Sequence, residues 1–354
     1  MTDVRAPVAP TDSASWRPLV ARYQRPRTRR AVWQIATTLL PLAILFATTY
    51  RLLAHSFWWA LVFAMPAAAL LVRTFVLMHD CAHGSFFASR RANRIVGVVT
   101  GLLTLMPFEH WRHEHGLHHA SAGDLDRRGH GDVETLTVRE YLRRTPWGRL
   151  RYRIIRHPLV FLVLGPLFFV LDKRLPPRGA SAGRRQIASV WTTNTAIVIA
   201  GGGLIALFGA RVLLIYLPAY YIAVAAGLWL FFVQHQFEGT YWEDHQRWDY
   251  ADAAIAGSSY FRLPSVLRWV TGSIGFHHVH HLGPRIPNYN LQRCHDENPI
   301  FHRATVVTLR ESLSALRLAL WDEDAGQLVR FDRALRPPSS LPSAPLHSAF
   351  VNPD

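Results

Sequence analysis

The hydrophobic residues of this 354-residue chain gather in long uncharged runs separated by short polar breaks. Four runs are long enough to cross a bilayer as helices, which takes about 20 residues. They cover residues 31–50, 52–72, 187–210 and 212–237. Only Arg51 separates the first two runs and only Arg211 the last two, so we expect two helical hairpins. The predicted spans are about 31–50, 52–78, 187–210 and 212–237.

Two further apolar runs, 95–108 and 158–171, are shorter and contain Pro and Gly. Each has only 14 residues, which suits an interfacial or re-entrant segment better than a span. We therefore expect four spans, not five or six.

The positive charge lies between the apolar runs. The chain has 39 Lys and Arg against 24 Asp and Glu, a net charge of +15, while half of its residues are hydrophobic. Basic loops between spans indicate the cytoplasmic side of a multi-pass membrane protein, and we expect that membrane to be a bacterial inner membrane. A nucleic-acid partner is disfavoured, because it would require these residues on one soluble face. Both termini and the middle segment are then expected in the cytoplasm.

Four regions follow from these patterns. Residues 1–30 are predicted to be a cytoplasmic tail without a cleaved signal peptide, and 31–302 the membrane domain. Residues 303–335 are predicted to be a helical cytoplasmic segment, because Leu309, Leu313, Leu316 and Leu320 share one helical face. Residues 336–354, like residues 1–20, have the composition of a mobile tail. Two cysteines do not suggest a disulfide framework.

Histidine spacing carries the chemical signal. His79 and His83 form an HxxxH pair, and residues 115–119 and 277–281 each contain HxxHH. Side chains at i, i+3 and i+4 share one helical face. His235, at the end of the last run, would emerge on the same side of the membrane as these clusters. The predicted ligands are His79, His83, His115, His118, His119, His235, His277, His280 and His281.

Nine imidazoles are too many for one zinc ion, which takes about four ligands. They suit two metals with four or five nitrogens each, although imidazole alone does not select among Fe, Cu, Ni and Zn. A zinc protease is disfavoured, since residues 113–118 read HExxxH instead of HExxH. Flanking histidines are expected to support the ligands or do nothing (His110, His113, His278 and His295), and the remainder to lie on the surface (His55, His130, His157, His245, His302 and His347).

The three clusters resemble the histidine boxes of membrane fatty acid desaturases. The neighbouring text is similar as well: HDCAHGSFFASRRAN, WRHEHGLHHASAGDLDRRGHGDVETLTVREY and GFHHVHHLGPRIPNYNLQRCH. Within that family the chain looks like the bacterial acyl-lipid enzymes related to the Δ12/ω3 group. Two positions depart from the usual pattern: Ala82 in the first box, and Glu134 where relatives often carry an aromatic residue.

The resemblance implies an all-α integral membrane protein whose cytoplasmic helical cap holds a histidine-ligated dimetal site. It implies two non-haem iron ions bound by the nine histidines, O₂ as co-substrate and removal of two hydrogens from an acyl chain. The expected substrate is a membrane lipid whose chain already carries one double bond. No fused cytochrome b5 sequence is visible, so electrons are expected from a separate ferredoxin-like protein drawn to the basic face.

Two alternatives stay open at this point. A diiron hydroxylase of the same membrane superfamily, acting on a lipid, alkane or carotenoid, would use the same ligands. A histidine-rich membrane metal transporter would instead place its ligands along a path within the spans.

Overall fold

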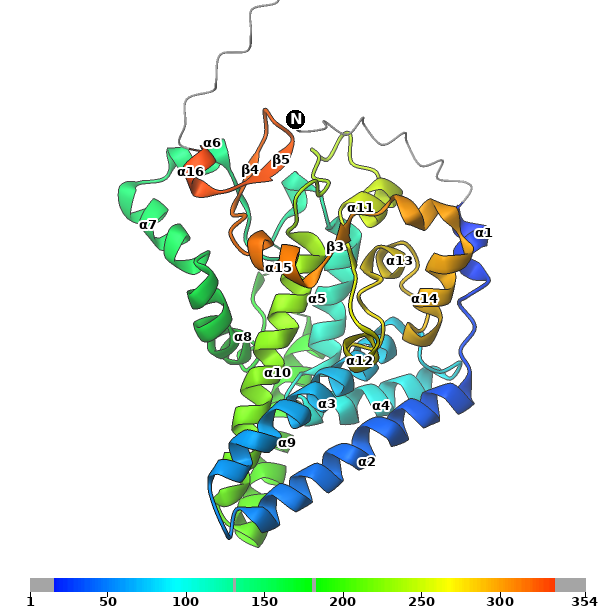
Figure 1. The fold of residues 1–354 in the computed structure, drawn as a ribbon, viewed down its shortest axis with the longest axis vertical. Coiled ribbons are helices and arrows are strands. Elements are labelled where there is room, and N and C mark those ends of the chain that lie inside the picture. The colour runs from blue at the N-terminus through cyan, green and yellow to red at the C-terminus, as the bar shows by residue number, and fades with distance from the viewer. Residues whose placement is uncertain (1–15, 130–131, 180–182, 335–354) are drawn as a thin grey trace, which may run out of the picture.

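The computed structural model describes residues 16–129, 132–179 and 183–334. Four helices in these ranges are long and apolar enough to cross a membrane: α2 (Thr28–Leu52), α3 (Trp58–His83), α9 (Arg184–Phe208) and α10 (Arg211–His235). This agrees with the four predicted spans. In Figure 1 these helices fill the lower part of the molecule, while the short helices and strands gather above them.

The four long helices meet at their lower ends. Residues 53–57 connect α2 to α3, and residues 209–210 connect α9 to α10. The Tyr50 hydroxyl at the end of α2 donates to the Phe208 carbonyl oxygen at the end of α9 (3.0 Å). The first connection is longer than predicted, because α2 continues through Arg51 and α3 begins only at Trp58. Helix α3 is the most buried of the four, and it packs against α2, α4 and α10.

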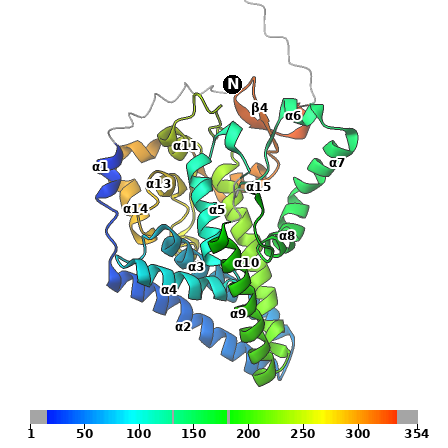
Figure 2. The same ribbon diagram turned by 180° about the vertical axis from the view of Figure 1, so that it is seen from behind.

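The two shorter apolar runs form separate helices. The first lies in α4 (Arg90–Leu103), after which α5 (Phe108–Ser121) begins. The second forms a π-helical turn, Val160–Leu164, followed by α8 (Gly165–Asp172). Together with α7 (Pro146–Ile155) this segment makes an arm that bends by 66° and packs against α10, and Figure 2 shows the arm from behind. By length and composition, α7 and the segment Val160–Asp172 can also be counted together as one broken span, which would raise the number of candidate spans in the described residues from four to five.

The upper part of the molecule is built from short elements. Its helices are α6 (Val138–Arg143), α11 (Tyr250–Ala256), α12 (Ser265–Val270), α13 (His277–Leu282) and α14 (Asn288–Glu297), with 3₁₀ turns at Leu125–Arg127 and Pro299–Arg303. The described chain is not purely helical. Strands β1 (Leu136–Thr137), β4 (Leu320–Asp322) and β5 (Gln327–Val329) form one sheet, and β2 (Tyr260–Phe261) and β3 (Val306–Val307) form another.

The prediction of a helical segment over 303–335 is wrong in most of its length. The helices there are α15 (Leu309–Ala315) and the short α16 (Phe331–Ala334), with β3, β4 and β5 around them. Leu320 lies in β4 and pairs with Val329, because residues 323–326 form a turn that brings β5 back alongside it. Leu313 is 61 % exposed, so the four leucines do not form one buried helical face.

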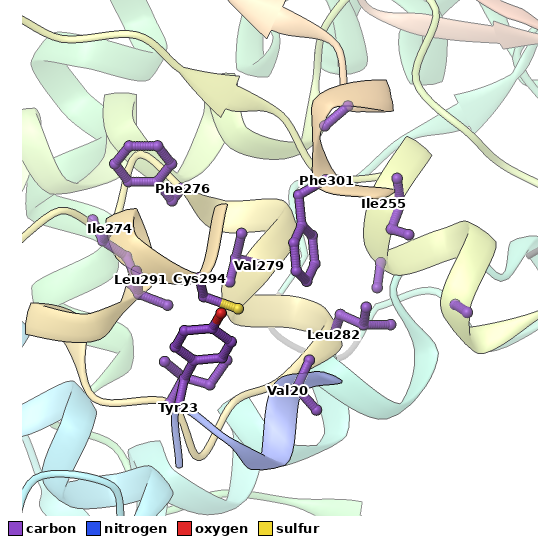
Figure 3. Packing of buried hydrophobic residues seen from close by; sticks show 14 of the residues in the cluster. Val20, Tyr23, Ile255, Ile274, Phe276, Val279, Leu282, Leu291, Cys294 and Phe301 are labelled. Carbon is purple, nitrogen blue, oxygen red and sulfur yellow. The ribbon is translucent and has the colours of Figure 1, made fainter. Parts of the chain in front are cut away.

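The N-terminal segment before α2 is partly ordered. Helix α1 (Trp16–Ala21) begins within the range predicted to be a mobile tail, and residues 1–15 lie outside the described chain. Val20 and Tyr23 are buried among residues of α13 and α14, including Leu282 and Leu291 (Figure 3). Burial of these two apolar side chains explains why the segment packs on the upper part of the molecule. The predicted tail 336–354 lies outside the described residues.

Candidate metal centre

Two long helices deliver three of the predicted ligands. His79 and His83 occupy the last turn of α3, so they lie one helical turn apart on the same face. The helix ends directly after them because Gly84 adopts a left-handed conformation (φ 66°), which glycine reaches without the steric cost of a β-carbon. His235 is the last residue of α10. These three histidines therefore belong to the ends of the long helices, and do not follow them.

Two shorter helices deliver the other six. Helix α5 starts after Pro107 and carries His115, His118 and His119 toward its C-terminal end. Helix α13 has only six residues, Phe276 precedes it, and three of its four histidines are predicted ligands (His277, His280 and His281). Four helices from separate parts of the sequence thus converge at the upper ends of α3 and α10.

The structure brings all nine predicted residues together in two adjacent groups. The five-histidine group contains His79, His83, His115, His119 and His280, and the four-histidine group contains His118, His235, His277 and His281. Within each group the potential ligand atoms lie within 4.8 Å of one another. Each HxxHH box is divided between the groups. The rings of His119 and His281, one from each group, stack with centroids 4.1 Å apart.

The Nε2 atoms converge at a spacing that fits a shared cation. In the five-histidine group, Nε2 of His115 lies 3.1 Å from Nε2 of both His79 and His119, and His119 Nε2 lies 3.0 Å from His280 Nε2. Nitrogens about 2.1 Å from one ion and at right angles to each other are about 3.0 Å apart. In the four-histidine group, the corresponding distances from His235 to His118 and His277 are 3.1 and 2.9 Å.

Hydrogen bonds alone do not explain this convergence. In one tautomer an Nε2 atom has either a proton or a lone pair in the ring plane, so it cannot donate to one neighbour and accept from another. Both His115 and His119 have two Nε2 neighbours, and His83 Nε2 is buried without a hydrogen-bond partner. A set of lone pairs directed at a common point is what a metal ion requires, so the residues fit metal binding.

Burial keeps the rings in the form that binds metal. Removal from water, reinforced by the neighbouring imidazoles, holds the pKa of His115, His119, His280 and His281 well below the usual value. Neutral imidazole is the ligand form, and a protonated ring would lose its lone pair.

Three supporting groups were not anticipated from the sequence. Asp132 Oδ1 accepts a hydrogen bond from His118 Nδ1 (2.5 Å), and the Gly257 carbonyl oxygen accepts one from His235 Nδ1 (3.2 Å). Both bonds leave Nε2 free to face the centre. Asp80 Oδ2 accepts from the Asn288 backbone N–H (2.7 Å), which joins the end of α3 to the start of α14. Asp132 follows Gly131 in the quoted segment WRHEHGLHHASAGDLDRRGHGDVETLTVREY, and this position was its only signal in the sequence.

The remaining histidines divide as follows. His278, although inside the third box, points away from the two groups and contacts His295. His110 lies 3.5 Å from Glu114 and His113 is half-buried. His245 binds Asp124 at the surface (2.8 Å). His55, His157 and His302 are exposed, as expected, and His130 and His347 lie outside the described residues.

An apolar cavity of about 200 Å³ adjoins the histidines. It runs between α3 and α10, from Leu71 and Tyr220 at one end to His79, His118 and His277 at the other. Trp111 and Phe231 line it beside the histidines; Trp111 stacks on His115 (4.3 Å) and Phe231 lies 5.1 Å from the ring of His118.

An ion pair also lines this cavity. Lys173, which follows α8, is buried and binds Glu114 of α5 (2.7 Å) and Asp172 (2.8 Å). The pair joins the end of the arm to the helix that carries the second box.

Comparison with known proteins places these features in context. A family model described as "Fatty acid desaturase" matches residues 56–308. A "Fatty acid desaturase" of Bacillus subtilis is 40 % identical over 325 residues, covering 91 % of this chain and 92 % of that protein. A Synechocystis protein named "sn-1 acyl-lipid omega-3 desaturase (ferredoxin)" is 28 % identical, over 71 % of this chain and 70 % of its own length. A Nicotiana tabacum "Omega-3 fatty acid desaturase, endoplasmic reticulum" is also 28 % identical, covering 62 % and 59 %.

Proposed function

This chain belongs to the fatty acid desaturase family, and we propose that it introduces a double bond into an acyl chain of a membrane lipid, using O₂ and two histidine-bound iron ions. The observation that carries the proposal is the convergence of nine buried imidazoles at the end of an apolar cavity. The five-histidine group would hold one iron and the four-histidine group the other. When bound, the two iron ions would supply O₂ activation and the oxidising power to break C–H bonds.

The protein's part in the reaction is to position one C–C bond. The cavity walls would hold the acyl chain along α3 and α10, with Trp111 and Phe231 fixing it beside the histidines. Exclusion of water by these apolar walls protects the reaction from side products. For each –CH₂–CH₂– converted to –CH=CH–, one O₂, two electrons and two protons yield two waters. Positioning matters because a displacement of about 1 Å can cost about 100-fold in rate.

The electron donor in this proposal is a separate ferredoxin-like protein. Support comes from the Synechocystis relative and from a sunflower relative (Helianthus annuus), both of which carry "(ferredoxin)" in their names. The same relatives are named as acyl-lipid enzymes, which supports a lipid-bound acyl chain as substrate here. An acyl chain that already contains one double bond is the substrate we expect, with a diene as product.

We place the two histidine groups on the cytoplasmic side of the bacterial inner membrane. The four long helices would then form two hairpins, residues 31–302 the membrane domain, and the short elements above them the cytoplasmic cap. The basic loops support this orientation. Residues 1–30 and 303–354 would both lie in the cytoplasm.

Product analysis tests the function. The protein is expressed in a host that lacks polyunsaturated lipids, and the fatty acid esters are analysed by gas chromatography with location of double bonds. New dienes are the expected result. A hydroxylated chain would instead support a hydroxylase, and no change with iron and donor supplied would exclude a fatty acyl substrate.

Histidine variants test the centre directly. His118→Ala and His280→Ala, one from each group, are expected to lower bound iron from two ions per chain and to abolish activity. His55→Ala, an exposed histidine far from the groups, is the matched control and should retain both. Stoichiometric zinc without iron in the active protein would contradict the diiron proposal, as would equal loss in all three variants.

A further inference from the structure

We propose that electrons enter the centre through a file of packed rings, His302, His295, Tyr260 and His278, and that the surface around His302 is the docking face for an acidic iron–sulfur protein. The inference rests on the proposed function, because it gives the route by which the donor reaches the metal ions. It assigns a role to histidines that the two groups do not use.

The need for such a route follows from burial. All the clustered histidines except the half-buried His83 are shielded from solvent, so a protein donor cannot touch them. Electron transfer through a protein slows steeply with distance and is slower across gaps than through packed or hydrogen-bonded atoms. A continuous file of contacts from the surface to a ligand is therefore favoured over one interrupted by space.

The inner half of the file starts beside a ligand. His278 follows His277 directly in α13, and its side chain is completely buried. Its Nε2 lies 3.0 Å from Nδ1 of His295 in α14, a hydrogen-bond distance. Phe276, on the other side of His277, lies 5.1 Å from the ring of His295. Figure 3 labels Phe276 together with Val279 and Leu282 of α13.

The outer half reaches the surface in one further step. The rings of His295 and His302 have centroids 4.9 Å apart, and His302 Nε2–H donates to the His295 carbonyl oxygen (3.0 Å). Tyr260 lies 4.9 Å from His295 and stacks on Phe276 (4.6 Å, 14° between planes). His302 is exposed, while His295 and Tyr260 are half-buried. Each step of the file is a direct ring contact or a hydrogen bond.

The composition of this cluster exceeds what packing needs. Three histidines and a tyrosine place polar atoms where apolar side chains would fill the same volume without having to be hydrogen-bonded. Aliphatic and aromatic residues do fill the adjoining core, including Val279, Leu291 and Phe301.

The charge around His302 fits an acidic partner. Arg303 directly follows His302. Arg262 directly follows strand β2, and its backbone N–H donates to the Val307 carbonyl oxygen of strand β3 (2.8 Å). Arg262 and Arg268 are both close enough to Tyr260 to oppose the rise in its pKa that burial causes, whereas Asp296 adds to that rise. Two other acidic groups are engaged: Glu297 pairs with Arg293, and Glu311 accepts a hydrogen bond from the backbone N–H of Thr308, the N-cap residue of α15. Basic patches of this kind steer acidic proteins into productive encounters.

The electron balance is simple. A reduced ferredoxin-like protein loses one electron at each encounter, and the metal centre gains it. Two encounters provide the two electrons that one double bond requires. No bond of the ring file is broken or formed.

The first test measures reduction, not turnover. Iron-loaded protein is mixed anaerobically with a reduced plant-type [2Fe–2S] ferredoxin, and the oxidation of the ferredoxin is followed by stopped-flow absorbance. We expect His295→Ala and His302→Ala to slow this transfer at least tenfold, and His295→Phe, which keeps a ring in place, to slow it less than His295→Ala. Reduction by dithionite with methyl viologen, and iron content, should be unchanged.

If both alanine variants oxidised ferredoxin as fast as the wild-type protein does, the proposed route would be overturned. So would a parallel loss of dithionite reduction and iron, because that result assigns the rings a structural role only. Failure of the wild type to bind iron or to desaturate after chemical reduction would instead overturn the proposed function, so the two failures are distinguishable.

The second test measures docking. Arg262→Glu together with Arg303→Glu should raise the dissociation constant for ferredoxin at least tenfold and weaken its dependence on salt. The matched control is Arg143→Glu together with Arg151→Glu, two exposed arginines of α6 and α7 that change the net charge equally. Equal weakening in both pairs would show that only the total charge matters, and would overturn the docking face.

Discussion

At the scale of single residues, each supported imidazole uses its two nitrogens for different tasks. His118 and His235 direct Nδ1 to an acceptor in the protein and Nε2 to the centre. Fixing the tautomer in this way orients the ring and makes Nε2 a better donor to a metal. Asp132 provides the charged version of this contact, and the Gly257 carbonyl oxygen the neutral version.

Asp132→Asn is therefore expected to weaken metal binding without unfolding the protein. The amide cannot supply the negative charge that holds the His118 N–H, and loss of such a partner typically costs 10- to 100-fold in affinity or activity. Competition with an iron chelator measures the affinity. Asp324→Asn changes an exposed aspartate that pairs with Arg139; this variant is the control and should bind iron as the wild type does. Unchanged chelator resistance in Asp132→Asn would remove its supporting role.

At the scale of elements, α10 combines two roles along its length. Its last residue, His235, joins the four-histidine group, and its middle turns form one wall of the apolar cavity. Gly227 lies in that wall, and a β-carbon added there would meet no atom within 4 Å. The missing side chain therefore leaves room in the cavity.

Gly227→Leu is expected to fill part of the cavity and to reduce desaturation at least tenfold, while iron content stays at the wild-type level. The physical reason is that the acyl chain and the new side chain would need the same volume. Gly203→Leu is the matched control, because this glycine of α9 also has open space around it but lies on an exposed face. Product yield by gas chromatography compares the two. Equal yields would mean that the acyl chain lies elsewhere.

At the scale of the whole molecule, the chain is an integral membrane protein whose polar and apolar parts are separated along one axis. The four long helices meet at one end, and the histidine groups lie at the other (Figure 1). In a membrane crossed by these four long helices, all the ligands would lie on one side, as the proposed orientation requires.

Cysteine labelling tests this shared side. In a background where the buried Cys81 and Cys294 are replaced by serine, Gln246→Cys should react from the cytoplasm and Ser56→Cys from the opposite side. Gln246 lies in the loop after α10, and Ser56 in the turn between α2 and α3. Labelling of both positions from the same side would contradict the proposed orientation. Arg149→Cys reports the side on which α7 lies.

Removal of iron should also lower the thermal stability of the whole protein. A ligand that binds only the folded state stabilises it, by about 2.7 kcal/mol when its free concentration is 100 times its dissociation constant. We expect chelation to lower the unfolding midpoint in detergent by several degrees, and added ferrous iron to restore it. An unchanged midpoint after complete iron removal would show that the nine imidazoles pack stably without a metal.

The sequence by itself determined the four apolar helices and the nine clustered histidines. Both are local patterns: a span needs an unbroken run of about 20 apolar residues, and an HxxHH box needs only helical periodicity. Local patterns failed where pairing with a distant segment decided the outcome. Leu320 lies in strand β4 because β4 pairs with β1 and β5. Helix α1 is ordered because it packs against α13 and α14.

Only the tertiary structure decided how the histidines are shared. Neighbours in one box, His118 and His119, go to different groups, because ring direction depends on how α5 sits against α3, α10 and α13. The same holds for His278, which the box includes by sequence but which points toward His295. Asp132 and Gly257 reach their histidines from other segments of the chain. Spacing along one helix fixes which side chains share a face. The histidine group that each side chain joins is instead fixed by the elements packed opposite that helix.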